Sequence, residues 1–129
     1  MRVTRCLVVV AVTMVATLAL TSTGAPQGQA EQHLQRGVEL LEAGHLAEAI
    51  DELQHAVALQ PGDARAQYQL GRALSTAGRQ TAAAEHLRAA LENTDEPGAV
   101  HFLLGQVLLE TGDLEAAHVS LEEAASSRP

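Results

Sequence analysis

The stretch QLGRALSTAGRQ, residues 69–80, has a counterpart 34 residues earlier, QRGVELLEAGHL, and another 34 residues later, LLGQVLLETGDL. In all three copies the third residue is glycine, the sixth is leucine and the tenth is a second glycine. A constant period of this length is typical of stacked supersecondary units. The same step continues beyond the copies, and the matched columns are Gly37/Gly71/Gly105, Leu40/Leu74/Leu108, Gly44/Gly78/Gly112, Ala49/Ala83/Ala117, Leu53/Leu87/Leu121 and Ala56/Ala90/Ala124.

Two helices joined by a glycine turn account for each unit. The first glycine of each copy lies inside a helix, where glycine costs about 1 kcal/mol relative to alanine, so it needs a compensating contact. Because it has no Cβ, it lets a second helix approach closely. The second glycine falls between the helices, where a left-handed residue is favoured. The residues of the second helix that we expect to face the first glycine are Ala49, Ala83 and Ala117.

The second helices are predicted from their apolar anchors and from the breaks that follow them. Pro61 ends the second helix of the first unit, and Asp63 is placed to cap the next helix. The anchors are Leu53, Leu87 and Leu121. We predict second helices at about residues 46–59, 80–93 and 114–126, within repeats at about 30–63, 64–97 and 98–129.

The repeats resemble the tetratricopeptide repeat (TPR) family over about residues 30–129. The resemblance implies an all-α fold, an α-solenoid of three antiparallel helix-turn-helix units in a right-handed superhelix. One departure is the aromatic residue that the family often places four positions before the glycine, since this chain has His33, Gln67 and His101 there. The positions that match the family's signature are Gly37/Gly71/Gly105, Ala49/Ala83/Ala117, Ala56/Ala90/Ala124 and Pro61/Pro129.

In the TPR family the first helices of the units line a concave groove that binds a protein or peptide. The resemblance implies that Tyr68 and Phe102, at one phase of neighbouring units, stand in this groove, and that Arg65 and Arg72 make its centre basic. Aromatic and arginine side chains dominate binding energy at interfaces. The alternative is that the two rings pack within or between units and support the fold. The full implied set is Leu34, Val38, Leu41, Glu42, Arg65, Tyr68, Arg72, Ser75, Thr76, Phe102, Gln106, Leu109 and Glu110.

No motif for catalysis or metal binding is evident in the sequence. Metal ligands on one helix need a spacing of three or four residues, which no pair of the histidines has. We therefore predict no metal ligand and no cofactor. The sequence also has no glycine-rich phosphate loop and no nucleophile elbow, so we predict that the protein is not an enzyme. The six histidines are His33, His45, His55, His86, His101 and His118.

The charge of the repeats restricts the class of partner. Residues 31–129 contain six arginines and sixteen acidic residues, a formal charge of −10. A domain this acidic repels nucleic acid and anionic membrane surfaces, so we predict a protein or peptide partner and no nucleic acid. The single cysteine, Cys6, precedes the repeats, which therefore contain no disulfide and no zinc thiolate.

Residues 1–30 have the order of a secretory signal peptide followed by a short polar linker. Arg2 and Arg5 supply positive charge, residues 6–20 are apolar apart from two threonines, and small polar residues follow. The apolar run is shorter than the roughly 20 residues that span a bilayer comfortably. This order predicts export to the periplasm or the cell exterior, with the TPR domain at residues 31–129.

Two readings of this N-terminal segment remain open. A cleaved signal peptide is expected to be cut after Gly24 or after Ala30, each of which follows small or polar residues. The alternative is an uncleaved anchor in the cytoplasmic membrane formed by residues 6–23, which contain no charge, and only in this case do we expect a membrane contact. In both cases the arginines hold the N-terminus inside, so the repeats face outwards.

The function expected from these features is that of a non-enzymatic scaffold that holds an extended or helical segment of an envelope protein. The alternative is a self-associating structural module. No further helix is predicted to cover the helix at about 114–126, whose outer face is mostly alanine with Val119. A flat face of this kind favours a weak homodimer through the last helix.

Export is the first prediction. Protein recovered from the cell envelope should have an intact mass that corresponds to a mature start between Ala25 and Glu31, because the signal peptide has been removed. Mass spectrometry of the purified protein measures this directly. A chain that retains Met1 and sediments with the membranes would contradict cleavage and favour the anchor.

Overall fold

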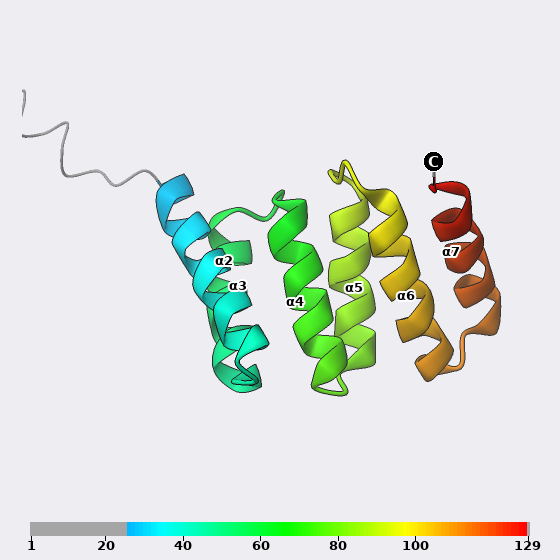
Figure 1. Ribbon diagram of the computed structural model, residues 1–129, viewed down its shortest axis with the longest axis horizontal. Helices are drawn as coiled ribbons and strands as arrows, with labels where there is room; N and C mark the ends of the chain where they lie inside the picture. The colour runs from blue at the N-terminus through cyan, green and yellow to red at the C-terminus, as the bar shows by residue number, and fades with distance from the viewer. Residues whose placement is uncertain (1–25, 129) are drawn as a thin grey trace, which may run out of the picture.

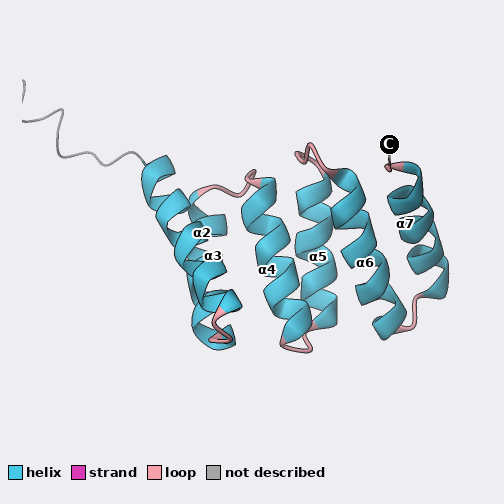
Figure 2. Cartoon of the chain, viewed as in Figure 1, coloured by secondary structure: helices cyan, strands magenta, loops and turns pink. Residues whose placement is uncertain are grey.

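The computed structural model describes residues 26–128, in which six α-helices follow one another in a row (Figure 1). In this part of the chain Figure 2 shows helices and loops and no strand. The predicted all-α solenoid of three antiparallel hairpins is confirmed, and the predicted second helices agree with α3, α5 and α7. The helices are α2 (Pro26–Glu42), α3 (Leu46–Leu59), α4 (Ala64–Thr76), α5 (Gln80–Leu91), α6 (Pro97–Thr111) and α7 (Leu114–Ser126).

The N-terminal segment is described only from Pro26 onwards. The predicted signal peptide and the predicted anchor at residues 6–23 lie outside the described residues. Helix α2 begins at Pro26, within the segment that we assigned to the polar linker. Among residues 26–128, no helix has the length and the apolar character needed to cross a membrane.

The turn between the two helices of each unit is set by a glycine in the left-handed conformation. The φ angles are +84° at Gly44, +79° at Gly78 and +83° at Gly112, as predicted. The residue after each glycine donates its backbone N–H to the carbonyl of the repeated leucine, which closes the helix end. These bonds are His45 to Leu40 at 2.9 Å, Arg79 to Leu74 at 2.9 Å and Asp113 to Leu108 at 3.0 Å.

The glycine inside each first helix makes room for a leucine of the second helix. A Cβ built on the glycine would come 2.6–2.8 Å from the Cγ of that leucine, closer than real Cβ atoms approach, in the pairs Gly37–Leu53, Gly71–Leu87 and Gly105–Leu121. We expected alanines to face these glycines. Ala49, Ala83 and Ala117 are fully buried in the same helix interface, but the leucine is the nearest neighbour.

Leucine and alanine form one continuous core through the three units. The largest fully buried side chains are Leu53, Leu70, Leu74, Leu87 and Val107.

Between the first two units, Asp63 caps α4 as predicted, because its carboxylate accepts a 2.9 Å hydrogen bond from the Arg65 backbone N–H.

Contacts between units place the first helices on the inside of the curve. Helix α4 contacts both α2 and α6, whereas α3 with α5 and α5 with α7 make no comparable contact among the described residues. Helices on the inner side of a curved stack lie closer together than those on the outer side. Helices α2, α4 and α6 therefore line the concave side.

In the first two units, the residue four positions before the glycine of the first helix forms a hydrogen bond with a side chain of the second helix. His33 Nδ1 lies 2.6 Å from Glu52 Oε2 in the first unit, and His86 Nδ1 lies 2.8 Å from Gln67 Oε1 in the second. The Gln67 amide nitrogen donates to the Pro61 carbonyl, so the Gln67 amide oxygen accepts the hydrogen bond that the His86 Nδ1–H donates. Burial lowers the pKa of His86 below its usual value.

A second prediction tests the glycine–leucine contact. Gly71→Leu places a side chain in the space that Leu87 occupies, so the helices of the middle unit must separate. Overpacking costs about 1–3 kcal/mol, which corresponds to a fall in Tm of about 4–8 °C for each kcal/mol in a domain of this size. Thermal unfolding followed by circular dichroism measures the change.

The matched control is Gly28→Leu in α2, where a Cβ meets nothing within 4 Å. This variant should melt like the parent or slightly higher, because leucine favours a helix more than glycine does. If Gly71→Leu melted as the control does, the close contact at Gly71 would be wrong.

Candidate functional site

The implied groove residues all lie on the concave helices, but their exposure differs. Phe102 and Leu109 are both 48% exposed, and Gln106 between them is exposed as well. Their spacing of four and then three residues places these three side chains on one face of α6. Helix α6 therefore presents an apolar face that includes two large side chains in contact with water.

The groove positions on α2 and α4 are less open. Leu34 is only 5% exposed and belongs to the core, so it is a packing residue and not part of an accessible wall. Val38, Leu41 and Tyr68 are half-buried and pack against the core. Ser75 is also half-buried, whereas Glu42 and Thr76 are exposed.

The side chains at one equivalent position of the three repeats differ in their exposure to solvent. Leu34, Tyr68 and Phe102 occupy the same phase and are buried, half-buried and half-exposed in that order. The next unit packs beside α2 and α4, but no described helix follows α7 to cover the corresponding side of α6. The two rings thus differ, because Tyr68 packs between units while Phe102 is open to a partner.

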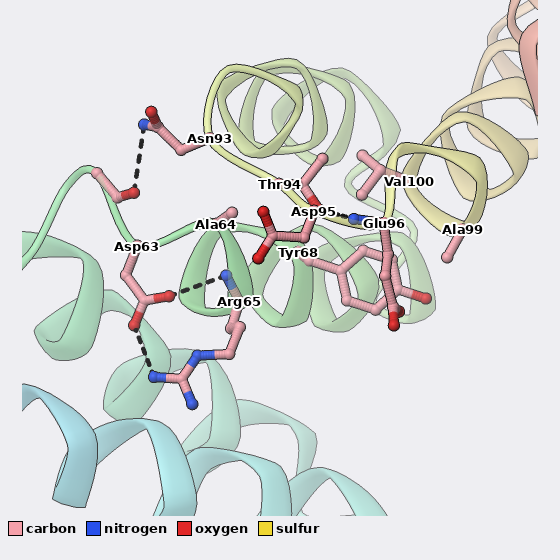
Figure 3. Close-up of a pocket in the computed structure, with 11 residues that line it drawn as sticks. Asp63, Ala64, Arg65, Tyr68, Asn93, Thr94, Asp95, Glu96, Ala99 and Val100 are labelled. Atoms are coloured by element: carbon pink, nitrogen blue, oxygen red, sulfur yellow. Dashed lines mark hydrogen bonds and ion pairs between the residues drawn. The ribbon is translucent and has the colours of Figure 1, made fainter. Parts of the chain in front are cut away.

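A pocket of about 530 Å³ lies between the start of α4, the start of α6 and the loop that joins α5 to α6 (Figure 3). The Tyr68 side chain extends from α4 towards the start of α6 (Figure 3). The loop is held in place by the Asn93 amide, which donates to the Gly62 carbonyl at 3.3 Å. The lining residues are Gly62, Asp63, Ala64, Arg65, Tyr68, Asn93, Thr94, Asp95, Glu96, Ala99 and Val100.

Arg65 does not make the groove basic, contrary to our expectation. Its Nη2 lies 2.7 Å from Glu31 Oε2 on α2 and 3.4 Å from Asp63 Oδ2. The hydrogen bond to Glu31, with the charge of Asp63, raises the pKa of Arg65. The neighbouring pocket also contains Asp95 and Glu96, so its net charge is negative.

Arg72 is the arginine of the groove that remains available. Its side chain is half-buried in α4, and its Nη1 lies 3.4 Å from the Gln69 amide oxygen. No carboxylate of residues 26–128 forms an ion pair with it. A partner carboxylate can therefore pair with Arg72 without displacing an acidic side chain of this chain.

The arrangement offers contact surfaces on the concave side and a cluster of metal-ligating side chains elsewhere. The cluster consists of His33 on α2 with Glu52 and His55 on α3. We did not predict it, because we compared histidines within one helix and at equivalent positions of different units, and not between the two helices of one unit. The available signal was the spacing of three residues between Glu52 and His55, together with the antiparallel pairing of Gly37 with Leu53, which brings His33 opposite them.

Comparison with known proteins gives a family model and several solved structures. The tetratricopeptide repeat model matches residues 34–97 and 83–129. The crystal structure of MamA is 27% identical with a TM-score of 0.75, and the match covers 78% of this chain and 59% of MamA. This chain thus spans less than two thirds of MamA. No curated protein matches the sequence.

Two further TPR structures show the same fold at lower identity. The second TPR of Spaghetti (RPAP3), bound to the HSP90 peptide SRMEEVD, is 17% identical with a TM-score of 0.75, and the match covers 79% of this chain and 94% of that one. The Sgt2 TPR domain from Aspergillus fumigatus is 19% identical with a TM-score of 0.72, covering 81% and 70%. Since the family model covers most of the chain and the hairpins stack as a solenoid, the protein belongs to the tetratricopeptide repeat family.

Proposed function

We propose that this protein is a non-enzymatic scaffold whose concave surface holds an extended or helical segment of an envelope protein. The apolar face of α6 supports this proposal most directly, because Phe102 and Leu109 are half-exposed on the same side as Gln106. TPR modules are generally protein-interaction modules, and the RPAP3 structure contains a bound peptide. Burial of exposed aromatic and aliphatic side chains is a main source of binding energy at such surfaces.

The charges on this surface suggest the chemistry of the partner segment. Asp95 and Glu96 border the pocket at Tyr68, and Arg65 is already paired with two carboxylates. A strongly acidic segment would be repelled here. We therefore expect an apolar segment that carries at most one carboxylate, placed to pair with Arg72.

Location in the envelope is part of the same proposal and rests on the order of residues 1–30. The start of α2 favours one of the two cleavage positions. Ala30 is only 3% exposed within the first turns of α2, so a cut after Ala30 would remove a buried residue. A cut after Gly24 leaves the whole helix intact, and we propose this position.

A third prediction tests the concave surface. With a photo-crosslinking residue at position 106, the protein should capture its partner in cells, whereas the same residue at position 85, on the outer helix α5, should not. Phe102→Ala should weaken binding of the captured partner by about 2 kcal/mol or more if the ring is a hot spot. Tyr68→Ala should weaken it as well, and both variants should keep their helical content.

The matched control is Leu114→Ala, which removes a 67% exposed apolar side chain outside the concave surface and should leave binding unchanged. Binding can be measured by calorimetry with the purified partner, and helicity by circular dichroism. Loss of helicity before any loss of binding would show that the two rings are core residues.

Self-association through α7 is the second candidate function. Among the described helices, α7 packs only on α6, and its Val119 and Leu114 are 59% and 67% exposed. Leu121 is used within its own unit against Gly105. The outer face is not mostly alanine, as we expected, because Ala117 and Ala124 are buried. The exposed apolar side chains of α7 are instead Leu114, Val119 and Ala125, which lie among acidic residues. Burial of Leu114 and Val119 against a second copy is the source of a weak pairing.

A fourth prediction tests this pairing. Sedimentation over a wide concentration range should show a monomer–dimer equilibrium, and Val119→Glu should shift it to monomer, because a buried unpaired charge is costly. Gln54→Glu on the exposed side of α3 is the control for added charge. A monomer at every concentration, unaffected by Val119→Glu, would rule out the dimer.

A further inference from the structure

Three side chains with metal-ligating atoms converge where α2 packs on α3. His33 comes from α2, while Glu52 and His55 lie one turn apart on α3. His33 Nδ1 is 2.6 Å from Glu52 Oε2, and the His33 and His55 ring centroids are 5.2 Å apart. One ligand atom from each of the three residues can be chosen so that all lie within 4.8 Å of one another.

This separation is close to what a zinc ion requires. In a tetrahedral site with Zn–N distances of about 2.0–2.1 Å, neighbouring ligand atoms stand about 3.3 Å apart. Rotation of the side chains about their χ angles can bring the ligand atoms, which lie within 4.8 Å of one another, to this spacing. Their positions permit such rotation, since the side chains of His33 and Glu52 are 34% and 21% exposed and His55 is exposed to solvent.

The cluster is specific to the first unit. The positions of His33, Glu52 and His55 correspond to Gln67, His86 and Ala89 in the second unit and to His101, Ser120 and Glu123 in the third. In the second unit the pair Gln67–His86 is a neutral hydrogen bond without a carboxylate. No other group of three such residues occurs within residues 26–128.

We propose that His33, Glu52 and His55 bind one Zn²⁺ ion that links α2 to α3. Two imidazoles and a carboxylate are a ligand set that zinc uses, and they leave one coordination position for water. The ion takes the place of the hydrogen shared between His33 and Glu52, and the neutral His33 ring then carries its proton on Nε2.

Linking α2 to α3 has a structural consequence. Helix α2 is the first described helix, and apart from α3 it has only a small contact with α4. A bound ion adds a further attachment of α2 to α3, beside the packing of Gly37 on Leu53 and the ion pair of Glu31 with Arg65 on α4. Because the ion binds the folded protein, it should raise Tm as its concentration rises above Kd.

The charge of Arg36 should weaken metal binding. Its removal therefore tests the proposal in the opposite direction from the removal of a ligand. Its Nη1 lies 3.5 Å from Glu52 Oε1, on the other oxygen of the ligating carboxylate. A guanidinium at this place repels a divalent cation and competes for Glu52. Removing it should therefore tighten metal binding, an effect that a purely structural hydrogen-bond cluster does not predict.

The experiment is a calorimetric titration of the purified protein, prepared without a histidine tag and freed of metal with EDTA, with ZnCl₂ and separately with MgCl₂. We expect one Zn²⁺ per chain, a rise in Tm that EDTA reverses, and no binding of Mg²⁺, which prefers oxygen ligands. His33→Gln and His55→Gln should each weaken the Zn²⁺ affinity by about tenfold or more. Arg36→Gln should strengthen it several-fold.

Two histidine–carboxylate pairs elsewhere serve as controls. On α7, His118 Nδ1 lies 3.6 Å from Glu122 Oε1, and before and within α3, His45 Nδ1 lies 3.9 Å from Glu48 Oε1. His118→Gln and His45→Gln should leave the affinity and the Tm rise unchanged. His55→Gln alters an exposed residue, so circular dichroism should confirm that it folds like the parent. Absence of Zn²⁺ binding, or binding that His118→Gln abolishes while His33→Gln and His55→Gln do not, would overturn the proposal.

Discussion

The contact between a glycine of the first helix and a leucine of the second holds each hairpin together. With a Cβ at Gly37, Gly71 or Gly105, the helices would have to move apart, because the leucine side chain fills that space. The contact also fixes the rotation of the first helix about its axis, since only one face carries the glycine. Fully buried alanines in the same interface keep the helices close along their length. Among the described residues no aromatic side chain is fully buried in the core, although Tyr68 packs against it, and close approach of backbones takes the place of large side chains.

The functional surface follows from this rotation. When the glycine face of α6 packs on α7, the face with Phe102, Gln106 and Leu109 is left open. Curvature adds to this effect, because the first helices contact one another across units while the second helices do not. The concave side is therefore assembled from α2, α4 and α6. The next unit in the stack decides how much of each first helix remains open, as the series Leu34, Tyr68 and Phe102 shows.

Particular residues show where prediction from the sequence succeeds and where it ends. The turn at Gly78 and the cap at Asp63 were predictable because each depends on neighbouring residues along the chain. The pairing of Arg65 with Glu31 was not, although the two residues are 34 positions apart and thus in equivalent places of adjacent units. Whether two equivalent side chains meet depends on the distance between units and on rotamers. A repeat period specifies neither quantity.

The sequence by itself determined the number of units, the approximate bounds of the second helices and the glycines at which the two helices of a hairpin meet. These properties depend on periodicity and on the local preferences of glycine, proline and capping residues, all of which can be read along the chain. Only the tertiary structure decided that Leu34 is buried, that Arg72 rather than Arg65 is free to bind, and that His33 meets Glu52 and His55. The reason is physical: burial, ion pairing and ligand clusters depend on distances across helices, and packing of one unit on the next sets those distances.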